Sequence, residues 1–559
     1  MRQRLPLLSL IFLLPLLVAW PLPAVWSSSW LTVPAGEAAI HVWGLWVTAA
    51  NQNLFTIETF ALAWPDGVQA VLADPANIPW FVLGWGLGPA AAYNTVVYAN
   101  LVLLGISGAA LAKRVGGSPT LGVIAACTNA SILAATTTGI TEHLGVGWIG
   151  LMIVCLLKAL EKGCKKSAVG AGVLLFMCAA SGPYCGVWAS FIATTIGIAH
   201  LFRKDRQQFF VPLGITAVVG GVLVAPLAQA IMSGRIAGQP GTAQLASQLL
   251  NRPANRAELY RGGLRFGADL TDSIVPVMFT GGAGLPNQTG YIGLIALLTA
   301  VFVCTKRKEM WPWLVGSLVF VALSWGPWLI YKGNPVTIDG APLLAPAGIL
   351  AKNVPFFSRI SHWQRAAAVA ALLLIPLVSL LPKLKLPKVV PWAVAGLLLI
   401  DHMIGSPLPW PLPSTPSINS SAYASIAQQK GSVLVLPKKF NSQLPPNAVW
   451  RDPAILAQLN HQRPISEAGT MGHEQSSGSS HAADIIVKIG LHGRIDRGHR
   501  NVFQDADFRW LAVYKRHINP DPVRDKYWAR CIGKPIAEDD SVVIYRLGDG
   551  IKEWCLGGS

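Results

Sequence analysis

The sequence predicts a mainly α-helical polytopic membrane protein that carries a soluble α/β domain at its C-terminal end. Three observations predict this fold class. Of the 559 residues, 52% are hydrophobic and only 13% are charged, with a mean hydropathy of +0.46. A soluble protein normally has about a quarter of its residues charged. Long apolar runs recur as far as residue 405, and the composition becomes that of an ordinary soluble protein after residue 406.

The apolar runs define the membrane-spanning helices. A run of about 20 residues crosses a bilayer as a helix. By this criterion we predict about eleven spans, at residues 5–25, 92–112, 119–139, 144–160, 168–184, 187–202, 210–232, 290–305, 311–331, 365–382 and 389–405. The first run contains prolines and lacks a clear small-residue cleavage site, so we interpret it as a membrane anchor and not as a signal peptide.

Basic residues predict the orientation of these spans. No Lys or Arg occurs between Arg4 and Lys113, and basic clusters then recur between apolar runs: Lys113–Arg114, Lys158–Lys166, Arg203–Arg206, Lys306–Lys308 and Lys383–Lys388. Short cytoplasmic loops collect positive charge, so these clusters and the N-terminus are predicted to be cytoplasmic. An odd number of spans then places the C-terminus outside. The net charge of +17 suits anionic lipid headgroups and predicts no nucleic-acid partner.

The predicted domain boundary lies at the proline-rich segment SPLPWPLPSTPS. Residues 1–405 form the membrane domain, with long outer loops at 26–91, 233–289 and 332–364, and residues 406–559 form an extracytoplasmic α/β domain. In that domain GSVLVLP, RWLAVYKR and SVVIYRL are typical of short strands. DPAILAQLNHQ is typical of a helix, and GTMGHEQSSGSSHAAD has the composition of a flexible loop.

The cysteines fall into two groups. Cys531 and Cys555 lie in the predicted extracytoplasmic domain. The sequence leaves two alternatives for them, a disulfide bond or two free thiols. The other six lie in or beside predicted spans and are interpreted as small apolar residues: Cys127, Cys155, Cys164, Cys178, Cys185 and Cys304.

Glu37 and His41 stand four residues apart in PAGEAAIHVWGLWVTAANQN, and this spacing puts them on one face of a helix. One interpretation is an interfacial helix, with Glu37 at the positive end of the helix dipole. Trp43 and Trp46 would then lie at the membrane surface, where aromatic side chains are common. The other interpretation is an active-site carboxylate with His41 as its neighbour.

Further acids lie on the same predicted outer side. Glu142 and His143 occupy the short turn between the third and fourth predicted spans, where an acid is either simply solvated or part of a site. The first outer loop adds Glu58, Asp66 and Asp74 and holds no basic residue. Such a loop attracts divalent cations, and Mg²⁺ and Mn²⁺ prefer oxygen ligands. The spacing matches no defined metal motif, so a divalent cation stays an open alternative.

Arg359, His362 and Arg365 occur together in PFFSRISHWQR, at the predicted outer end of the tenth span. Basic residues on this side run against the positive-inside trend. The arginines either anchor the chain in lipid headgroups or form an anion site for phosphate or pyrophosphate, which suits the guanidinium group.

The sequence lacks the motifs of several common functional classes. The sequence contains no nucleophile elbow, P-loop, zinc motif or Rossmann glycine pattern. Few ionisable residues lie within the spans, and Asp401 and His402 sit near the outer end of the last one. This scarcity argues against a proton-driven pump, which needs buried acids or histidines along a path.

The order of several segments resembles a known superfamily. These segments are GEAAIHVWGLW, a Trp-Pro-Asp-Gly turn, AAYNTVVYANLVLLGISGAALAKRVGGS, VPFFSRISHWQR, SVLVLP and LNHQRPI. They are spread from Gly36 to Ile465, so the resemblance extends over most of the chain. In this order the chain resembles the large bacterial membrane proteins of the GT-C glycosyltransferase superfamily, including the YfhO-like group.

The resemblance implies a polytopic enzyme of the bacterial inner membrane with its site on the outer face. It would transfer a sugar from a polyprenyl-phosphate donor to a glycan, lipid or protein acceptor. Glu37 would match the catalytic or metal-binding acid of the first outer loop, where relatives commonly show Asp, and Glu142 would match an assisting acid. Arg359 and Arg365 would face the lipid phosphate.

The remaining candidate substrate-binding residues are His41, Asp66, His143 and His362. The competing hypothesis is a non-enzymatic flippase for lipid-linked glycans or a cell-envelope assembly scaffold. Such a protein would use the same anion site without a base.

Overall fold

The computed structural model describes residues 4–33, 37–51, 56–59, 61, 68–71, 74–201, 207–233, 267–275, 290–332, 334–354, 357, 360, 362–405, 410–417, 420–437, 453–466, 477–496, 499, 502–515, 518, 521–547 and 551–557. The chain forms two compact units. The first consists of Met1–Thr32, Ala73–Gln229 and Pro240–Thr415, and the second of Val33–Leu72, Ala230–Gln239 and Pro416–Ser559. Val33–Leu72, which we predicted within the membrane domain, thus belongs to the unit that holds the C-terminal residues.

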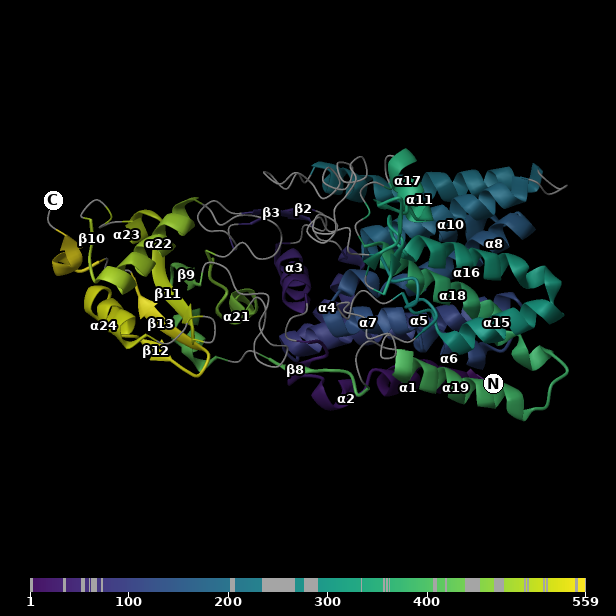
Figure 1. Ribbon diagram of the computed structural model, residues 1–559, viewed down its shortest axis with the longest axis horizontal. Coiled ribbons are helices and arrows are strands. Elements are labelled where there is room, and N and C mark those ends of the chain that lie inside the picture. Colours follow the sequence, from purple (N-terminus) through teal and green to yellow (C-terminus); the bar gives the residue numbers. More distant parts are fainter. Residues whose placement is uncertain are drawn as a thin grey trace. The chain divides into compact units, whose positions relative to one another are not determined.

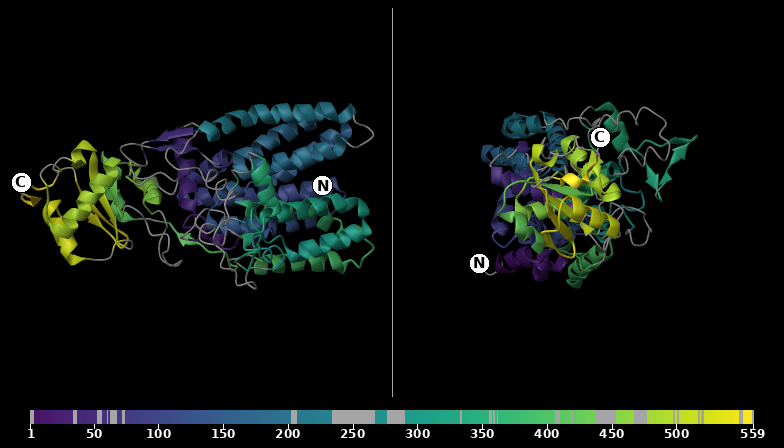
Figure 2. Two further views of the ribbon diagram at one scale, coloured as in Figure 1. Left: turned by 45° about the horizontal axis from the view of Figure 1, so that its top comes forward. Right: turned by 90° about the vertical axis from the view of Figure 1, so that its left-hand side faces the viewer.

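The first unit is a bundle of helices (Figures 1 and 2). Its longer helices are α1 (Arg4–Val18), α5 (Pro89–Arg114), α6 (Pro119–Cys127), α7 (Ala130–Thr138), α8 (Val146–Lys162), α9 (Lys165–Ser181), α10 (Pro183–Leu201), α11 (Gln207–Ser233), α15 (Leu294–Lys306), α16 (Trp311–Ser324), α18 (Ala366–Ser379) and α19 (Val389–Gly405). Short elements join them: α2 (Leu22–Val25), β1 (Ser29–Trp30), η1 (Pro75–Asn77), α4 (Ile78–Trp85), η2 (Thr141–His143), η4 (Lys308–Met310), β4 (Ile330–Tyr331), β5 (Asn334–Pro335), β6 (Thr337–Ile338), β7 (Ala341–Pro342), α17 (Pro346–Asn353), η6 (Trp363–Arg365), η7 (Leu381–Lys383) and β8 (Thr415–Pro416).

Four stretches in the described part of the chain are helical, long and apolar enough to cross a membrane: Pro89–Arg114, Thr141–Lys162, Phe210–Gln229 and Trp363–Lys383. The α6–α7 pair, bent by 41°, adds a fifth if it forms one span. A helix or helix pair lies in each of the eleven ranges predicted as spans. Outside the four stretches and the bent pair, no described helix is both long enough and apolar enough to count as a span. The helices are those of a multi-pass membrane protein, and the count of eleven spans stays a prediction.

Local sequence signals explain where several helices begin and end. The side chains of Ser118 and Asn129 each accept a hydrogen bond from the backbone N–H three residues later, at 3.5 and 3.2 Å, and so cap α6 and α7. α7 and α8 end at Gly139 and Gly163, with φ of 78° and 60°. Glycine adopts this left-handed conformation without the steric penalty of a Cβ atom.

Helix α18 forms the centre of the first unit, because every residue from Ala366 to Ser379 is buried. Its alanine-rich first turns allow neighbouring helices to approach closely. Two side chains from other helices donate hydrogen bonds to its backbone carbonyls: Ser317 to Ala370 at 2.8 Å and Asn129 to Ala368 at 3.0 Å. These contacts fix the start of α18 in the bundle, directly after η6.

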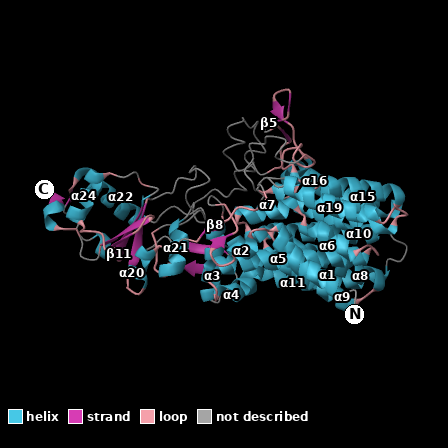
Figure 3. Ribbon diagram, turned by 90° about the horizontal axis from the view of Figure 1, so that it is seen from below, coloured by secondary structure: helices cyan, strands magenta, loops and turns pink. Residues whose placement is uncertain are grey.

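The second unit contains a four-stranded sheet in the order β12–β13–β11–β9. Figure 3 draws its strands, β11 among them, in magenta. β9 (Ser432–Leu436) runs parallel to β11 (Phe508–Tyr514), and β13 (Val542–Arg546) runs antiparallel to β11. The remaining elements are α3 (Ala38–Asn51), β2 (Thr56–Thr59), β3 (Val68–Val71), η8 (Ser421–Tyr423), α20 (Ala424–Ala427), α21 (Pro453–His461), α22 (Ser477–His492), β10 (Ile495–Asp496), α23 (Val502–Asp505), α24 (Pro522–Cys531), β12 (Ala537–Glu538), η11 (Glu553–Cys555) and β14 (Leu556–Gly557). The three strands and the helix predicted from sequence are therefore present.

Side chains from the two faces of this sheet contribute to two hydrophobic clusters. Along β11, Trp510, Ala512 and Tyr514 belong to one cluster together with residues of α3 and α21. Leu511 and Val513 belong to the other, with residues of α22 and α24. Alternate residues of a strand point to opposite faces, so a sheet with helices on both sides buries both sets.

The predicted flexible loop GTMGHEQSSGSSHAAD is wrong in its second half, because α22 begins at Ser477. The Ser- and Gly-rich composition hid a helical pattern. Ala482, Ile486 and Ile489 are fully or almost fully buried in the cluster against the sheet. Burial of this apolar face outweighs the weak helix propensity of the serines and glycine.

The structure settles the cysteine alternatives in favour of a disulfide. Cys531 and Cys555 are bonded, with their Cα atoms 5.6 Å apart. The other six cysteines are free, and four of them are buried.

Candidate functional site

Glu142 and Arg365 form a buried ion pair in the first unit. Glu142 lies in η2, in the turn between α7 and α8, and Arg365 is the last residue of η6, before α18. Only 14% of the Glu142 side chain and 5% of the Arg365 side chain are exposed. The structure thus brings together two residues predicted at the outer ends of different spans. An ion pair this deeply buried requires both partners, since either charge alone in a low-dielectric site is strongly disfavoured.

Tyr184 and His362 complete the surroundings of the Arg365 guanidinium. The guanidinium carbon lies 4.5 Å from the centroid of the Tyr184 ring, as in a cation–π contact. The Tyr184 hydroxyl and Nδ1 of His362 are 3.0 Å apart, within hydrogen-bonding distance. Tyr184 stands in the first turn of α10. The guanidinium is therefore held between a carboxylate and an aromatic ring, which fixes the direction of its N–H donors.

Aromatic side chains form an apolar wall near this group. Trp363 in η6 has its ring centroid 6.1 Å from that of Phe357 and 5.9 Å from that of Trp188. Phe320 approaches Trp188 edge-on at 5.8 Å, and Phe191 approaches Phe320 in the same way. Apolar walls exclude water and strengthen the electrostatic interactions beside them.

His143 is also buried, with 4% of its surface exposed. It follows Glu142 in the chain and interacts electrostatically with Arg365 and His362. Neither ring nitrogen of His143 has a hydrogen-bond partner among the described residues. A buried imidazole of this kind can offer a donor or an acceptor to a substrate hydroxyl.

A second polar network adjoins Glu142 through the preceding residue, Thr141. Asp74 is fully buried and accepts hydrogen bonds from the Thr141 hydroxyl and, at 3.1 Å, from the Asn77 amide. Asn77 in turn accepts a hydrogen bond of 2.8 Å from the amide of Asn100 in α5. The network ties the turn that carries Glu142 to the segment before α4.

In the sequence alone Asp74 is only one of several acids of the first outer loop. Two signals could have singled it out. An Asp-Pro pair at Asp74 and Pro75 is typical of a helix start. Asn100 is a polar residue inside a long apolar helix, where such residues usually have a specific partner. Neither signal identifies Asp74 as a neighbour of the Glu142 turn.

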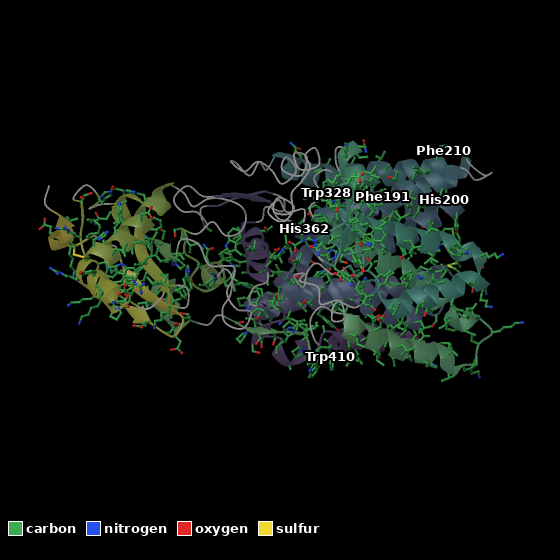
Figure 4. The ribbon with its side chains drawn as sticks, in the orientation of Figure 1. Phe191, His200, Phe210, Trp328, His362 and Trp410 are labelled. Atoms are coloured by element: carbon green, nitrogen blue, oxygen red, sulfur yellow. A yellow bond between two sulfur atoms is a disulfide. The ribbon has the colours of Figure 1, made fainter. Side chains whose placement is uncertain are left out.

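Figure 4 places His362 near one end of the helical bundle and Phe210 near the other. Phe210 follows the basic cluster Arg203–Arg206 in the sequence, which we predict to be cytoplasmic. The Glu142–Arg365 site therefore lies at the end of the bundle for which we predict an outward orientation.

Glu37 and His41 belong to the second unit. Their carboxylate and imidazole are 3.9 Å apart (Glu37 Oε2 to His41 Nε2), and 38% of the Glu37 side chain is exposed. The interpretation of their helix as purely interfacial is wrong for Trp43, which is fully buried in the second unit. Its indole N–H donates a hydrogen bond of 2.6 Å to Gln458 in α21. Trp46 packs against the same cluster, so both tryptophans serve the core of this unit.

Two predicted site residues, Asp66 and Arg359, lie outside the described residues. Within the described ranges, no group of three or more His, Cys, Asp and Glu side chains could hold a metal ion. Glu142 is engaged by Arg365, and Asp74 by Thr141 and Asn77. Both carboxylates thus have partners in the described structure, and the divalent cation stays a prediction.

Comparison with solved structures identifies the fold. Over 98% of its length the chain is similar to the arabinofuranosyltransferase AftD from Mycobacteria, with a TM-score of 0.57 and 15% identity. The fold is GT-C-like. A mutant of AftD gives a TM-score of 0.52 at 14% identity. An oligosaccharyltransferase from Archaeoglobus fulgidus, of which the chain covers 68%, gives 0.48 at 10% identity over 91% of this chain.

The similarity to AftD shows the fold alone, because the sequence identity is low. The chain spans 40% of the length of AftD. No family model matches the chain, and no curated protein matches it.

Proposed function

We propose that this protein transfers a sugar from a polyprenyl-phosphate donor to an extracytoplasmic glycan, lipid or protein acceptor. Two findings support the proposal: the GT-C-like fold and the buried Glu142–Arg365 pair, which is the observation that carries it. The sequence resemblance to GT-C proteins of the bacterial inner membrane, including the YfhO-like group, points the same way. The active site would face outward, opposite the predicted cytoplasmic clusters.

Arg365 is the proposed phosphate-binding residue. When the sugar leaves the donor, negative charge grows on the lipid phosphate, and a positive group already in place stabilises that charge. The ion pair with Glu142 and the contact with Tyr184 hold the guanidinium before the donor binds. Because the group is fixed in advance, little reorganisation is needed during the reaction.

Glu37 is the proposed base that takes the proton of the acceptor. An inverting transfer needs such a base, and the partly exposed carboxylate of Glu37 lies 3.9 Å from the imidazole of His41. Glu142 is the proposed assisting acid, which acts by holding Arg365. We propose that three histidines contact the sugar or the acceptor: His41, His143 and His362. Asp66 is a further proposed substrate-binding residue, and Arg359 is proposed to face the lipid phosphate.

A requirement for a divalent cation is an alternative form of this proposal. A divalent cation could supply positive charge to the leaving phosphate. The described residues offer no set of ligands for it, so the proposed chemistry assigns that charge to Arg365.

The proposal is tested by sugar transfer in proteoliposomes with a panel of polyprenyl-phosphate sugars. Wild type is compared with Glu37→Gln and Arg365→Gln. Arg524→Gln is the matched control, because Arg524 also lies over an aromatic ring, at 4.9 Å from Trp528, and next to an acid. We expect Arg365→Gln to lower turnover by about 100-fold or more, Glu37→Gln to abolish it, and Arg524→Gln to leave it unchanged.

Two results would overturn the proposal. One is wild-type protein that consumes no donor while it still moves lipid-linked sugars across the bilayer, which would favour a flippase. The other is a folded Arg365→Gln variant that is as active as wild type. Sugar transfer measured with and without an excess of EDTA separates a metal-dependent reaction from a metal-free one.

A further inference from the structure

A cavity of about 310 Å³ opens in the first unit between the start of α6, η7 and the start of α19. Its lining combines apolar side chains, among them Leu121, Leu384 and Trp392, with three polar ones, Ser118, Thr120 and Lys388. Small-ligand sites in proteins begin at about this volume and have this composition, a mostly apolar wall with a few polar groups. Nothing in the proposed transfer reaction uses this cavity.

The surroundings of the cavity are strongly basic. Lys383, Lys385 and Lys388 lie on one connection between α18 and α19, and all three are exposed. In the described part of the chain none of them takes part in an ion pair, whereas Arg114 at the end of α5 is paired with Glu161. The sequence contains no Asp or Glu between residues 340 and 400 or between 75 and 141, so no acid from these segments neutralises the lysines.

The polar groups and the lysines are held together by the fold. The backbone N–H of Ser118 donates a hydrogen bond of 2.7 Å to the carbonyl of Ser379, the last residue of α18. This bond joins the start of α6 to the chain segment that leads into the lysines. The Ser118 hydroxyl oxygen accepts the cap hydrogen bond from the Leu121 N–H. Among the described residues neither the Ser118 nor the Thr120 hydroxyl donates a hydrogen bond, so the proton of each can be donated to a ligand.

The apolar side of the cavity continues toward the surface expected to face lipid. Trp392 and Val389, both at the start of α19, are each 67% exposed. Trp residues are common where a membrane helix meets the headgroup layer. The cavity therefore sits where a lipid could place its headgroup among the lysines and its chains along α19.

We propose that this cavity binds the headgroup of an anionic phospholipid on the cytoplasmic side of the membrane. Basic pockets between membrane helices on that side are known to bind acidic lipid headgroups. The charge, the hydroxyls and the volume fit a phosphodiester, and the apolar wall fits the acyl chains of a lipid better than it fits free phosphate. The proposal does not depend on the glycosyltransferase function.

The test measures lipid binding to the purified full chain by native mass spectrometry, in detergent with equal amounts of phosphatidylglycerol and phosphatidylcholine. Lys388→Gln removes a charge that lines the cavity, and Lys308→Gln removes one from another exposed cluster on the same predicted side. A lysine near an anionic membrane surface contributes a factor of about five in affinity. We expect Lys388→Gln to weaken phosphatidylglycerol binding by about fivefold and Lys308→Gln to leave it unchanged.

A second pair of variants tests the cavity itself. Thr120→Phe fills it without a change of charge, and Val315→Phe adds the same ring at an exposed position of α16 that does not line the cavity. We expect only Thr120→Phe to abolish the preference for phosphatidylglycerol. If Thr120→Phe does not fold, the two lysine variants still decide the matter.

Three outcomes would overturn the proposal. Wild type could bind phosphatidylglycerol and phosphatidylcholine equally. The two lysine variants could weaken binding equally, which would indicate general surface charge and no defined site. Inorganic phosphate at millimolar concentration could displace the lipid completely, which would make the cavity a site for a soluble anion.

Discussion

Each of the two units places an arginine between a carboxylate and an aromatic ring, but the two groups differ in burial. In the first unit Arg365 and Glu142 are 5% and 14% exposed. In the second unit Arg524 and Asp525, which lie 3.2 Å apart, are 17% and 50% exposed. Because Asp525 is half exposed, its carboxylate keeps much of its hydration in the folded state, and pairs at the surface contribute about 0–1 kcal/mol. A buried pair holds two charges out of water, so the removal of one partner is far more damaging.

This difference separates a site from a surface contact. Arg524 and Asp525 are neighbours in sequence, and their contact requires no tertiary structure. Arg365 and Glu142 are 223 residues apart, and the whole bundle is needed to bring them together. A fold that maintains a buried charge pair at one end of a bundle has a reason to do so, and phosphate binding is the reason we propose.

The largest expected effect comes from breaking the buried pair. Arg365→Gln leaves the Glu142 carboxylate buried without its cation, and we expect a loss of about 3–5 kcal/mol in the free energy of unfolding of the first unit. Arg524→Gln should cost less than about 1 kcal/mol. Urea denaturation of the full chain in detergent, followed by hydrogen exchange in peptides from each unit, measures both losses.

A double variant sharpens this result. Arg365→Gln with Glu142→Gln removes both charges, so we expect most of the lost stability to return while sugar transfer stays lost. Equal stability losses for Arg365→Gln and Arg524→Gln would contradict the distinction between the two groups.

The two units differ next in their covalent links. The second unit contains the Cys531–Cys555 disulfide, which closes a loop of sequence separation 24, whereas the cysteines assigned to the first unit are free. A loop of this size contributes about 3 kcal/mol by restricting the unfolded chain. We therefore expect the double variant Cys531→Ser/Cys555→Ser to lose about 3 kcal/mol in the second unit. Hydrogen exchange of peptides from both units of the full chain measures the loss.

The control for the disulfide variant is Cys155→Ser, a free and half-buried cysteine of α8. It should leave the second unit unchanged. An equal loss in both units for the double variant would mean that the disulfide does not act locally.

The sequence predicted some of these features well for physical reasons. Alternating basic clusters and apolar runs predict on which side each turn lies, so Glu142 and Arg365 could be expected on the same side of the membrane. The short strands of the second unit were visible because β-branched and apolar residues are concentrated in them. Cys531 and Cys555 were candidates for a disulfide because both lie in the predicted outer domain.

Other features depended on contacts that no local pattern encodes. Trp43 suited a membrane interface by residue type, but its burial depends on Gln458, 415 residues later. The ion pair itself joins residues far apart in sequence, and the polar network of Asp74 depends on packing between η1, η2 and α5. In α22, apolar spacing over 16 residues outweighed a loop-like composition.

The smallest expected effect concerns pH and the buried histidine of the second unit. His461 stacks on Tyr423 with ring centroids 4.9 Å apart, and its Nδ1 accepts a hydrogen bond of 3.0 Å from the backbone N–H of Arg463. Burial, reinforced by the positive charge of Arg463, lowers the pKa of His461 to about 3. The usual pKa of histidine is about 6.5, so the unfolded chain takes up a proton at a pH where the folded chain does not.

The sign of the pH effect follows from this difference. Between about pH 6.5 and pH 3 the unfolded state binds more protons, so the second unit should lose stability as the pH falls, by roughly 1 kcal/mol per pH unit. His461→Asn retains an acceptor for the Arg463 N–H and does not titrate, so it should remove most of this slope. His492→Asn, at an exposed position in the same unit, should retain it. Hydrogen exchange of second-unit peptides in the full chain between pH 6.5 and 5, corrected for the intrinsic exchange rate, measures the slope, and a flat wild-type profile would mean that His461 is not held neutral by its surroundings.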